Sequence, residues 1–360
     1  MRQEIVHLNF AKGFRGGERQ TLLLIEQLAA RGYVQKLITR RDAELAERCG
    51  HVAGLAVVRL EQPYVLRGGV AREAALLHAH ETRALQFAYY CHLVHRLPLI
   101  VTRRVDNRIK TNPVNRIMYA GAARAVALSR VIEREMLRVS PGARTVIIPS
   151  AFSGDAVDGA AAARIRARFA DRFLVGHVGA LVDGHKGQAV LIEAARALER
   201  TRPEIHFLLL GRGEDEELLK TRAAGLGNLT FAGFVDNIAD YISCFDLFVF
   251  PSRHEGLGSI LLDAMRLQVP IVASAVGGIP DLVTDGKDGV LVPPGDAAAL
   301  QKAILDLHAH PRKRQELAAS ATDTVARYSP ASMADAYARL YAEAGVPAPP
   351  DYAPRSGSAT

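Results

Sequence analysis

The chain has 360 residues, 49% of them hydrophobic, which is enough for two domains that each bury a core. No run approaches the roughly 18 consecutive apolar residues that a membrane-spanning helix needs, and residues 1–8 lack the apolar stretch of a signal peptide. The lack of a long apolar run excludes an integral membrane protein. The three scattered cysteines exclude a disulfide scaffold and favour a cytoplasmic protein.

The positive charge is concentrated in the first part of the chain. Residues 1–150 carry 24 lysines and arginines against 12 acidic residues, whereas the remainder carries 21 against 26. The basic residues are dispersed and few aromatic residues accompany them, so nucleic acid is not an expected partner. A solvated surface explains part of such an excess. For the remaining excess of positive charge, a phosphorylated glycolipid or the anionic inner leaflet of a membrane is a better expected partner than nucleic acid.

The first predicted strand covers residues 4–9, and a glycine loop with Gly16 and Gly17 leads from it into a helix over 22–30. This loop differs from the dinucleotide pattern Gly-x-Gly-x-x-Gly, and no acidic residue ends the next strand, 34–39. NAD is therefore not expected. Arg15 flanks the loop and can add charge to it, although a tight turn without a ligand is the alternative.

Two further strands, 75–79 and 99–102, end in polar residues that should lie at the carboxyl edge of a parallel sheet, where α/β proteins bind ligands. The first ends at His80 and the second at Arg103 and Arg104. An arginine pair suits a phosphate or carboxylate on an acceptor. The alternatives are a surface ion pair with Asp106 for the arginines and a satisfied strand-end role for the histidine.

Strands are also predicted over 124–128 and 145–148, and an interdomain linker near 150–170. A second α/β domain then begins with a strand over 173–179. It is followed by a glycine loop with His185 and Lys186, a helix to about residue 200, and strands over 205–210 and 229–231.

The most informative stretch follows a strand over 246–250. Glu255 lies in the next loop, and small residues lead into an apolar helix over 260–267: Gly256, Leu257, Gly258 and Ser259. Exposed backbone N–H groups at a helix start favour an anion such as a diphosphate. Because a carboxylate repels phosphate, Glu255 is expected to accept hydrogen bonds from sugar hydroxyls attached to that phosphate.

A strand over 270–274, a glycine-led helix and a short strand over 290–292 complete this region. One glycine loop alone is typical of any α/β unit. Together, Pro-Ser-x-x-Glu-Gly-x-Gly from Pro251, Asp263, Gly-Gly-x-Pro-Asp from Gly277 and Pro-Pro-Gly-Asp ending at Asp296 resemble the retaining glycosyltransferases of family 4. The second half of the chain matches closely, and the first half matches in its layout and its glycine loop. The resemblance implies the GT-B fold, with two Rossmann-like, doubly wound parallel-sheet domains facing across a cleft.

The resemblance also implies roles for individual residues. Relatives often have arginine where this chain has Ala180, and glutamate where it has Asp263, so Lys186 becomes the main charge on the leaving diphosphate. Glu255 and Lys186 are the expected catalytic residues. Expected donor contacts are Gly16, Gly17, His185, Phe234, Gly256, Leu257, Gly258, Ser259 and Asp263, and expected acceptor contacts are Arg15, His80, Arg103 and Arg104.

The resulting expectation is retaining transfer of a sugar, from a UDP-sugar, to a hydroxyl of a glycan or glycolipid in lipopolysaccharide core or other cell-envelope synthesis. No cofactor and no metal are expected, and the enzyme would contact the anionic inner membrane face peripherally. The expected domains are 1–160 for the acceptor and 161–328 for the donor, with a helix over 329–346 crossing back and a disordered tail over 347–360. A sugar-nucleotide epimerase and a non-catalytic nucleotide-sugar-binding subunit are the alternatives.

Overall fold

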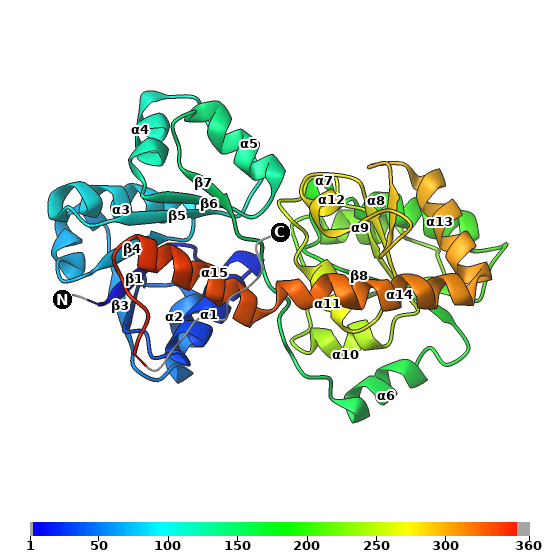
Figure 1. Ribbon diagram of the computed structural model, residues 1–360. Helices are drawn as coiled ribbons and strands as arrows, with labels where there is room; N and C mark the ends of the chain where they lie inside the picture. The colour runs from blue at the N-terminus through cyan, green and yellow to red at the C-terminus, as the bar shows by residue number, and fades with distance from the viewer. Residues whose placement is uncertain (1–2, 351–360) are drawn as a thin grey trace. The chain divides into compact units, whose positions relative to one another are not determined.

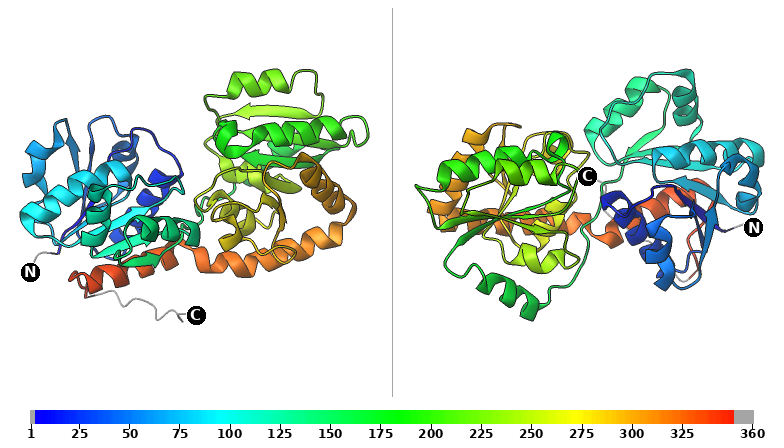
Figure 2. Two further views of the ribbon diagram at one scale, coloured as in Figure 1. Left: turned by 90° about the horizontal axis from the view of Figure 1, so that it is seen from above. Right: turned by 180° about the vertical axis from the view of Figure 1, so that it is seen from behind.

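The computed structural model describes residues 3–350, so the tail beyond residue 350 lies outside the described residues. The chain divides into two compact units (Figure 1). Unit 1 comprises the residues up to Ser153 together with those from Ser329 onward, and unit 2 is Gly154–Tyr328. Each unit is built around one parallel sheet with helices on both faces, as the further views in Figure 2 show.

Unit 1 contains a seven-stranded sheet in the order β3-β2-β1-β4-β5-β6-β7. Its strands are β1 (Ile5–Asn9), β2 (Gln35–Arg40), β3 (Leu55–Leu60), β4 (Leu76–Ala79), β5 (Leu99–Arg103), β6 (Arg124–Ala127) and β7 (Thr145–Ile147). All pairings are parallel. The predicted strands are present, and the structure adds the half-exposed edge strand β3, which was not predicted although residues 55–58 form a short apolar run.

The helices of unit 1 are α1 (Gly16–Ala29), α2 (Glu44–Arg48), η1 (Cys49–His51), η2 (Tyr64–Ala71), α3 (Thr82–His95), α4 (Pro113–Gly121), α5 (Arg130–Val139) and α15 (Pro330–Glu343). Helix α15 packs beside α1, and both contribute to one core with the sheet. The side chains of Tyr337 and Tyr341 on α15 are completely buried there. The end of the chain is thereby part of the first unit.

Unit 2 contains a six-stranded parallel sheet in the order β10-β9-β8-β11-β12-β13. Its strands are β8 (Phe173–Val178), β9 (Ile205–Leu210), β10 (Leu229–Gly233), β11 (Leu247–Phe250), β12 (Ile271–Ser274) and β13 (Val290–Val292). Every residue of β9 and β11 is buried, as continuous apolar runs in a sheet covered on both faces predict.

The helices of unit 2 are α6 (Gly159–Ala167), α7 (Asp183–Lys186), α8 (Gln188–Leu198), α9 (Glu216–Arg222), α10 (Ile238–Ser243), α11 (Ile260–Arg266), α12 (Ile279–Leu282), α13 (Ala297–Ala309), α14 (Pro311–Val325) and η3 (Ala326–Tyr328). Helices α8 and α13 pack together over an apolar core, and α11 packs on α14. Helix α6, within the stretch expected as a linker, packs on α10. None of the described helices is both long and apolar enough to cross a membrane.

Candidate active site

In each sheet the strand order reverses beside the first strand of the unit. The reversal falls between β1 and β4 in unit 1 and between β8 and β11 in unit 2. The connections after these two strands leave in opposite directions, so their loops separate at the carboxyl edge and leave room for a ligand. In unit 2 the two loops carry Lys186, after β8, and Glu255, after β11.

Lys186 and Glu255, which are 69 residues apart in the chain, meet at this edge. Lys186 Nζ lies 2.5 Å from Glu255 Oε2, and their side chains are 23% and 15% exposed. Lys186 Nζ also lies 5.0 Å from the centroid of the Phe250 ring, at the end of β11. The two residues expected from the sequence to act on the donor therefore form one partly buried ion pair.

Glycines let the loop backbones approach closely around this pair. Gly187 has φ +66°, and a Cβ there would lie 2.1 Å from the carbonyl oxygen of Pro251. The Arg253 N–H donates to His185 O at 2.8 Å, which joins the two loops. On the other side of the pair, a Cβ at Gly277 would lie 1.9 Å from Glu255 O, to which Gly278 N–H donates. Main-chain contacts on both sides thus fix the backbone of Glu255.

The loop after Glu255 leads directly into α11. The N–H groups of Leu257, Gly258 and Ser259 have no acceptor within residues 3–350, and Ser259 provides no side-chain cap for the helix. Gly258 has φ +85°, which turns the chain into the helix. These donors can receive an anion next to Lys186. Asp263 lies further along α11 and is half-buried.

Phe234 and His185 lie on other loops of the same edge. Phe234 directly follows β10 and its side chain is 59% exposed. Because β10 is two strands from β8, its end is roughly 10 Å from the end of β8. His185 is exposed, and its ring centroid lies 5.8 Å from that of His254. A ligand that touches both Phe234 and Lys186 must therefore be extended along the edge.

A buried histidine beneath the ion pair was not identified from the sequence. His177, in β8, has Nδ1 3.0 Å from the carbonyl oxygen of Val249 and Nε2 3.4 Å from Gln188 Nε2. Burial lowers the pKa of His177 to about 4, and the nearby charge of Lys186 acts in the same direction. Gln188 in turn donates to Ala180 O, at 2.8 Å. The signal was a single histidine inside an otherwise apolar strand.

In unit 1, Gly16 and Gly17 form the first turn of α1 and Arg15 is its N-cap residue. The Arg15 N–H donates to Glu18 Oε2 at 3.0 Å. Burial raises the pKa of Glu18, although that backbone donor and Arg104 act against the shift. A Cβ at Gly17 would lie 3.4 Å from Arg104 Cδ, so the glycine loop and the end of β5 are in contact.

The expected arginine pair separates into two environments. Arg103 is buried, and its Nη2 donates to the carbonyl oxygen of Asn107. All three guanidinium nitrogens of Arg104 are buried and have no hydrogen-bond partner in the described chain. Neither arginine forms an ion pair with Asp106 within residues 3–350. The alternative of a surface ion pair is therefore wrong.

His80 belongs to a buried group of three histidines with His7 and His78. Atoms of the three rings lie within 4.8 Å of one another, a spacing compatible with a metal ion. However, both ring nitrogens of His7 and both of His78 already form hydrogen bonds, to His80, Gln35, Tyr341 and Thr102. The charge of Arg104 also lowers the pKa values of His78 and His80 after the larger effect of burial. A cation is not favoured there.

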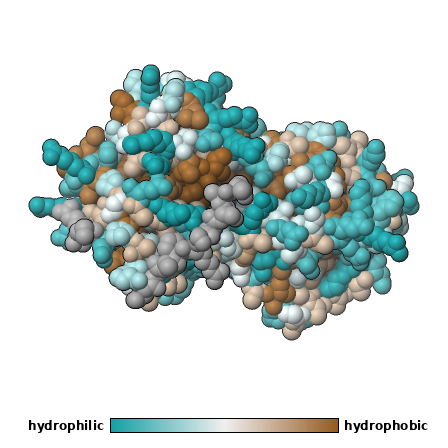
Figure 3. Space-filling view, viewed as in Figure 1, coloured by the Kyte–Doolittle hydropathy of each residue, from teal (hydrophilic) through white to brown (hydrophobic). Residues whose placement is uncertain are grey.

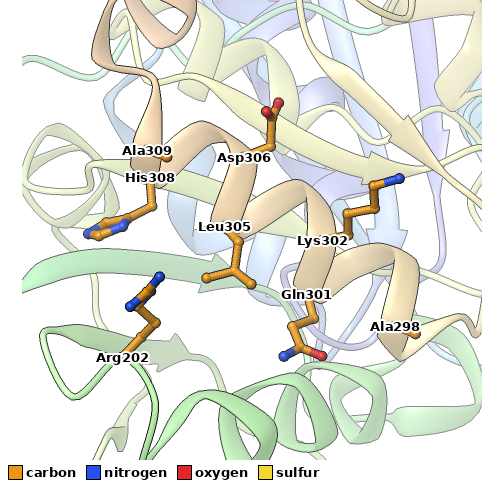
Figure 4. Close-up of a pocket in the computed structure, with 8 residues that line it drawn as sticks. All are labelled: Arg202, Ala298, Gln301, Lys302, Leu305, Asp306, His308 and Ala309. Carbon is orange, nitrogen blue, oxygen red and sulfur yellow. The ribbon is translucent and has the colours of Figure 1, made fainter.

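Two surface hollows in the described chain lie elsewhere. One of about 560 Å³ is lined by α13 and Arg202, and Figure 4 shows Gln301, Leu305 and His308 facing Arg202 across it. Arg202 precedes the amino end of β9, whereas ligands of such sheets bind at the carboxyl edge. The hollow carries no convergent set of buried polar groups, so the loops around Lys186 and Glu255 remain the candidate site.

Comparison with known proteins agrees with this geometry. Residues 172–310 match the family model described as "Glycosyl transferases group 1". A GDP-mannose-dependent alpha-(1-6)-phosphatidylinositol monomannoside mannosyltransferase of Mycolicibacterium smegmatis is 30% identical over 318 residues, which cover 84% of this chain and 76% of that protein. The chain belongs to the group 1 glycosyltransferases. Among other members, the lipopolysaccharide core biosynthesis glycosyltransferase LpsE of Rhizobium meliloti is 28% identical over 94% of this chain and 99% of its own.

Solved structures show that this group 1 glycosyltransferase has the GT-B fold. Anabaena Alr3699/HepE, in complex with UDP and glucose, aligns with a TM-score of 0.83 at 20% identity over 94% of this chain and 99% of that one. Sucrose-phosphate synthase from Thermosynechococcus elongatus aligns with a TM-score of 0.78 at 21% identity over 95% and 99%. The expected fold class, two parallel-sheet α/β domains, is confirmed.

We predict that His177 makes unit 2 less stable in mild acid. Its pKa is about 4 in the folded chain against 6.5 as the ordinary value, so between these pH values the unfolded chain binds more protons. The contribution is complete above pH 6.5 and is lost as the pH falls towards 4, by at most about 1.4 kcal/mol per pH unit. Urea unfolding at pH 7 and pH 5 should give a smaller loss of stability in His177→Gln than in wild type. His310→Gln, at an exposed position, is the control, and equal losses in all three proteins would contradict the prediction.

Proposed function

We propose that this glycosyltransferase moves a sugar from a UDP-sugar to a hydroxyl of a glycan or glycolipid, with retention of configuration and without a metal. The observation that carries the proposal is the Lys186–Glu255 pair beside the open N–H groups of Leu257, Gly258 and Ser259. Together they offer positive groups for a diphosphate and a carboxylate for a neutral polyol within one small region.

Charge on the departing diphosphate is the main electrostatic demand of such a transfer. Lys186 and the N–H groups at the start of α11 stabilise this charge as it develops, which is typically worth a few kcal/mol per donor group. Without a ligand, Lys186 is paired with Glu255 at 2.5 Å. Donor binding replaces that contact, so that Lys186 turns to phosphate oxygens and Glu255 accepts hydrogen bonds from the sugar hydroxyls.

The remaining donor contacts follow the extension of a nucleotide along the sheet edge. Phe234 lies at the base end, Asp263 is assigned to the ribose, and His185 stands beside Lys186. Gly256 completes the loop, and the family pattern assigns Gly16 and Gly17 of unit 1 to a phosphate of the donor or of the acceptor. UDP is favoured because the aligned Anabaena protein was crystallised with UDP and glucose.

The acceptor assignment rests on the chemistry of unit 1. His80, Arg103 and Arg104 lie at the carboxyl ends of β4 and β5, and Arg15 is the N-cap residue of α1, which follows β1. Residues 1–150 hold a strong excess of basic residues. An anionic glycan or glycolipid fits this charge, and the similarity to LpsE favours lipopolysaccharide core synthesis. The assigned site residues favour transfer over a non-catalytic subunit, which would bind the nucleotide and never turn over.

A panel of nucleotide sugars tests the donor. The purified protein is heated with UDP-, GDP-, ADP-, CMP- and dTDP-sugars, each with and without EDTA, because a bound nucleotide raises the unfolding midpoint by mass action. A UDP-sugar should raise the midpoint equally in both conditions. A shift abolished by EDTA would refute metal independence, and no shift at millimolar concentrations would favour a chain without donor binding. Release of UDP without transfer would indicate an epimerase, and NMR of the anomeric proton of a transfer product tests retention.

Substitutions should separate the two catalytic roles. Glu255→Gln should lower kcat by at least about 100-fold, because it weakens the grip on the sugar, while UDP binding is retained or tightened since Lys186 loses its competing carboxylate. Lys186→Met should weaken UDP binding and lower kcat together. Glu316→Gln, at an exposed position on α14, is the matched control. Loss of UDP binding in Glu255→Gln would refute the assigned role of this residue.

We also propose that unit 1 contacts an anionic membrane through an α4 patch. This patch consists of the exposed apolar residues Val105, Val114 and Ile117 and the exposed basic residues Arg108, Lys110 and Arg116. Asp106 is the one acidic residue from 105 to 132. Figure 3, which has the same view as Figure 1, shows hydrophobic surface among hydrophilic side chains in the part of unit 1 where α4 lies. Apolar contact combined with positive charge is typical of binding to an anionic bilayer.

Sedimentation with lipid vesicles checks this patch. Wild type should bind vesicles containing phosphatidylglycerol better than pure phosphatidylcholine vesicles, and 0.5 M salt should weaken binding by screening. Ile117→Asp should reduce binding severalfold. Val34→Asp, which alters an equally exposed valine far along the chain from α4, should not. Equal binding of both vesicle types, or equal effects of both variants, would contradict the proposal.

A further inference from the structure

The guanidinium group of Arg104 is the most unusual charged group in the described chain. Nε, Nη1 and Nη2 are all buried, and none has a hydrogen-bond partner, which holds for no other arginine in residues 3–350. Burial lowers the pKa of Arg104, but an arginine guanidinium does not lose its proton in proteins, so it cannot escape this cost by becoming neutral. A buried, unpaired charge is costly, so such a group calls for an anion that the described chain does not supply.

The surroundings of Arg104 increase the need for an anion. The Cδ atom packs against Gly17 in the first turn of α1, a 14-residue helix whose N-terminus carries partial positive charge. The N–H groups of Gly16 and Gly17 have no acceptor in the described chain. Glu18 is the nearby acid, but its carboxylate bonds to Arg15 N–H and forms no ion pair with Arg104. Two positive features, the Arg104 guanidinium and the N-terminus of α1 with its free N–H groups, therefore meet one carboxylate that is already engaged.

His80 adds a second unpartnered buried atom, Nδ1. The proton positions follow from the chain of hydrogen bonds that ends at this ring. Gln35 Nε2 donates to Ile25 O, so Gln35 Oε1 accepts from His7 Nε2. His7 Nδ1 must then accept from His80 Nε2, at 2.9 Å. This leaves a lone pair on His80 Nδ1, which suits a hydroxyl donor.

We propose that Arg104, His80 and the first turn of α1 form a binding site for a phosphate or carboxylate group that stands beside a free hydroxyl. Arg104 and the N–H groups of Gly16 and Gly17 receive the anion, and His80 Nδ1 accepts from the hydroxyl. Assignment of the anion to the sugar acceptor, rather than to the donor diphosphate, rests on the proposed transferase function. The group that binds is the same chemically in both cases.

The site differs from the arginine pair expected from the sequence. Arg103 donates to Asn107 O, although its Nε has no partner in the described chain, whereas all three guanidinium nitrogens of Arg104 lack one. Since its guanidinium is covered, entry of the anion requires the side chain to turn outward or the first turn of α1 to move. Either movement ends the burial of an unpaired charge. The free energy of the ligand-bound state is therefore lowered relative to that of the closed, unliganded state.

Thermal unfolding with small probes tests the site without any transfer reaction. Inorganic phosphate, glycerol 3-phosphate and glycerol are compared at constant ionic strength, in wild type, Arg104→Met and Arg134→Gln, which alters an exposed arginine on α5. Phosphate should raise the midpoint of wild type and Arg134→Gln, glycerol 3-phosphate should raise it more, and glycerol should not. Arg104→Met should bind both anions at least about tenfold more weakly.

The unliganded midpoint distinguishes a binding role from a structural one. Arg104→Met should unfold at a higher temperature than wild type without ligand, because it removes an unpaired buried charge while keeping the aliphatic stem. A lower midpoint, or an anion response equal to that of wild type, would overturn the proposal. UDP affinity should be unchanged in Arg104→Met if the anion belongs to the acceptor and should fall about tenfold if it belongs to the donor. Glu255→Gln should keep the phosphate response while losing transfer, so failure of this site and failure of the proposed function give different results.

Discussion

The reversal of strand order in each parallel sheet is the constraint on which the sites of both units depend. A parallel sheet places all its carboxyl ends at one edge, and the reversal parts two neighbouring loops there. In unit 2 this brings Lys186 and Glu255 together across 69 residues of sequence. In unit 1 it brings the glycine loop after β1 beside the polar residues that end β4 and β5. The sheet topology therefore brings together side chains that are far apart in the sequence, and the residues themselves carry no signal of that contact.

The two edges differ in how they hold charge in the absence of a ligand. In unit 2 the cation and the carboxylate satisfy each other, so little cost accompanies the unliganded state, and a ligand must compete for both groups. In unit 1 the Arg104 guanidinium has no partner, and a ligand competes with nothing there. A paired site favours selectivity, because only a ligand that offers both a diphosphate and hydroxyls compensates both partners. An unpaired site favours affinity for any anion that fits.

Strands, glycine loops and the candidate site residues Lys186 and Glu255 were predictable because each has a local signal. Continuous apolar runs predict β8, β9 and β11, and the residues around Glu255 form a pattern that needs no tertiary information. The edge strand β3 was missed although residues 55–58 form an apolar run, because so short a run does not by itself distinguish a strand from another kind of segment. His177 and the difference between Arg103 and Arg104 were beyond reach for another reason. Adjacent residues of the same type have opposite environments when the strand ends between them, and only packing decides which one is paired.

The polar core of unit 1 explains why α15 belongs to it. Tyr341 Oη lies 2.7 Å from His78 Nδ1, and Tyr337 Oη lies 2.9 Å from Thr102 Oγ1, inside an otherwise apolar contact. Apolar residues would pack equally well there, but they would allow the helix to slide along the sheet. A shift of one turn would leave the buried His78 and Thr102 without partners, so the hydroxyls fix the register of the helix. Tyr337, Tyr341 and Glu18 also lie near enough to Arg104 to influence the pKa of its guanidinium. The network that holds the last helix in place therefore also lies near the unpaired guanidinium of Arg104. A movement that lets an anion reach Arg104 either preserves the hydrogen bonds of Tyr337 and Tyr341 or breaks both of them.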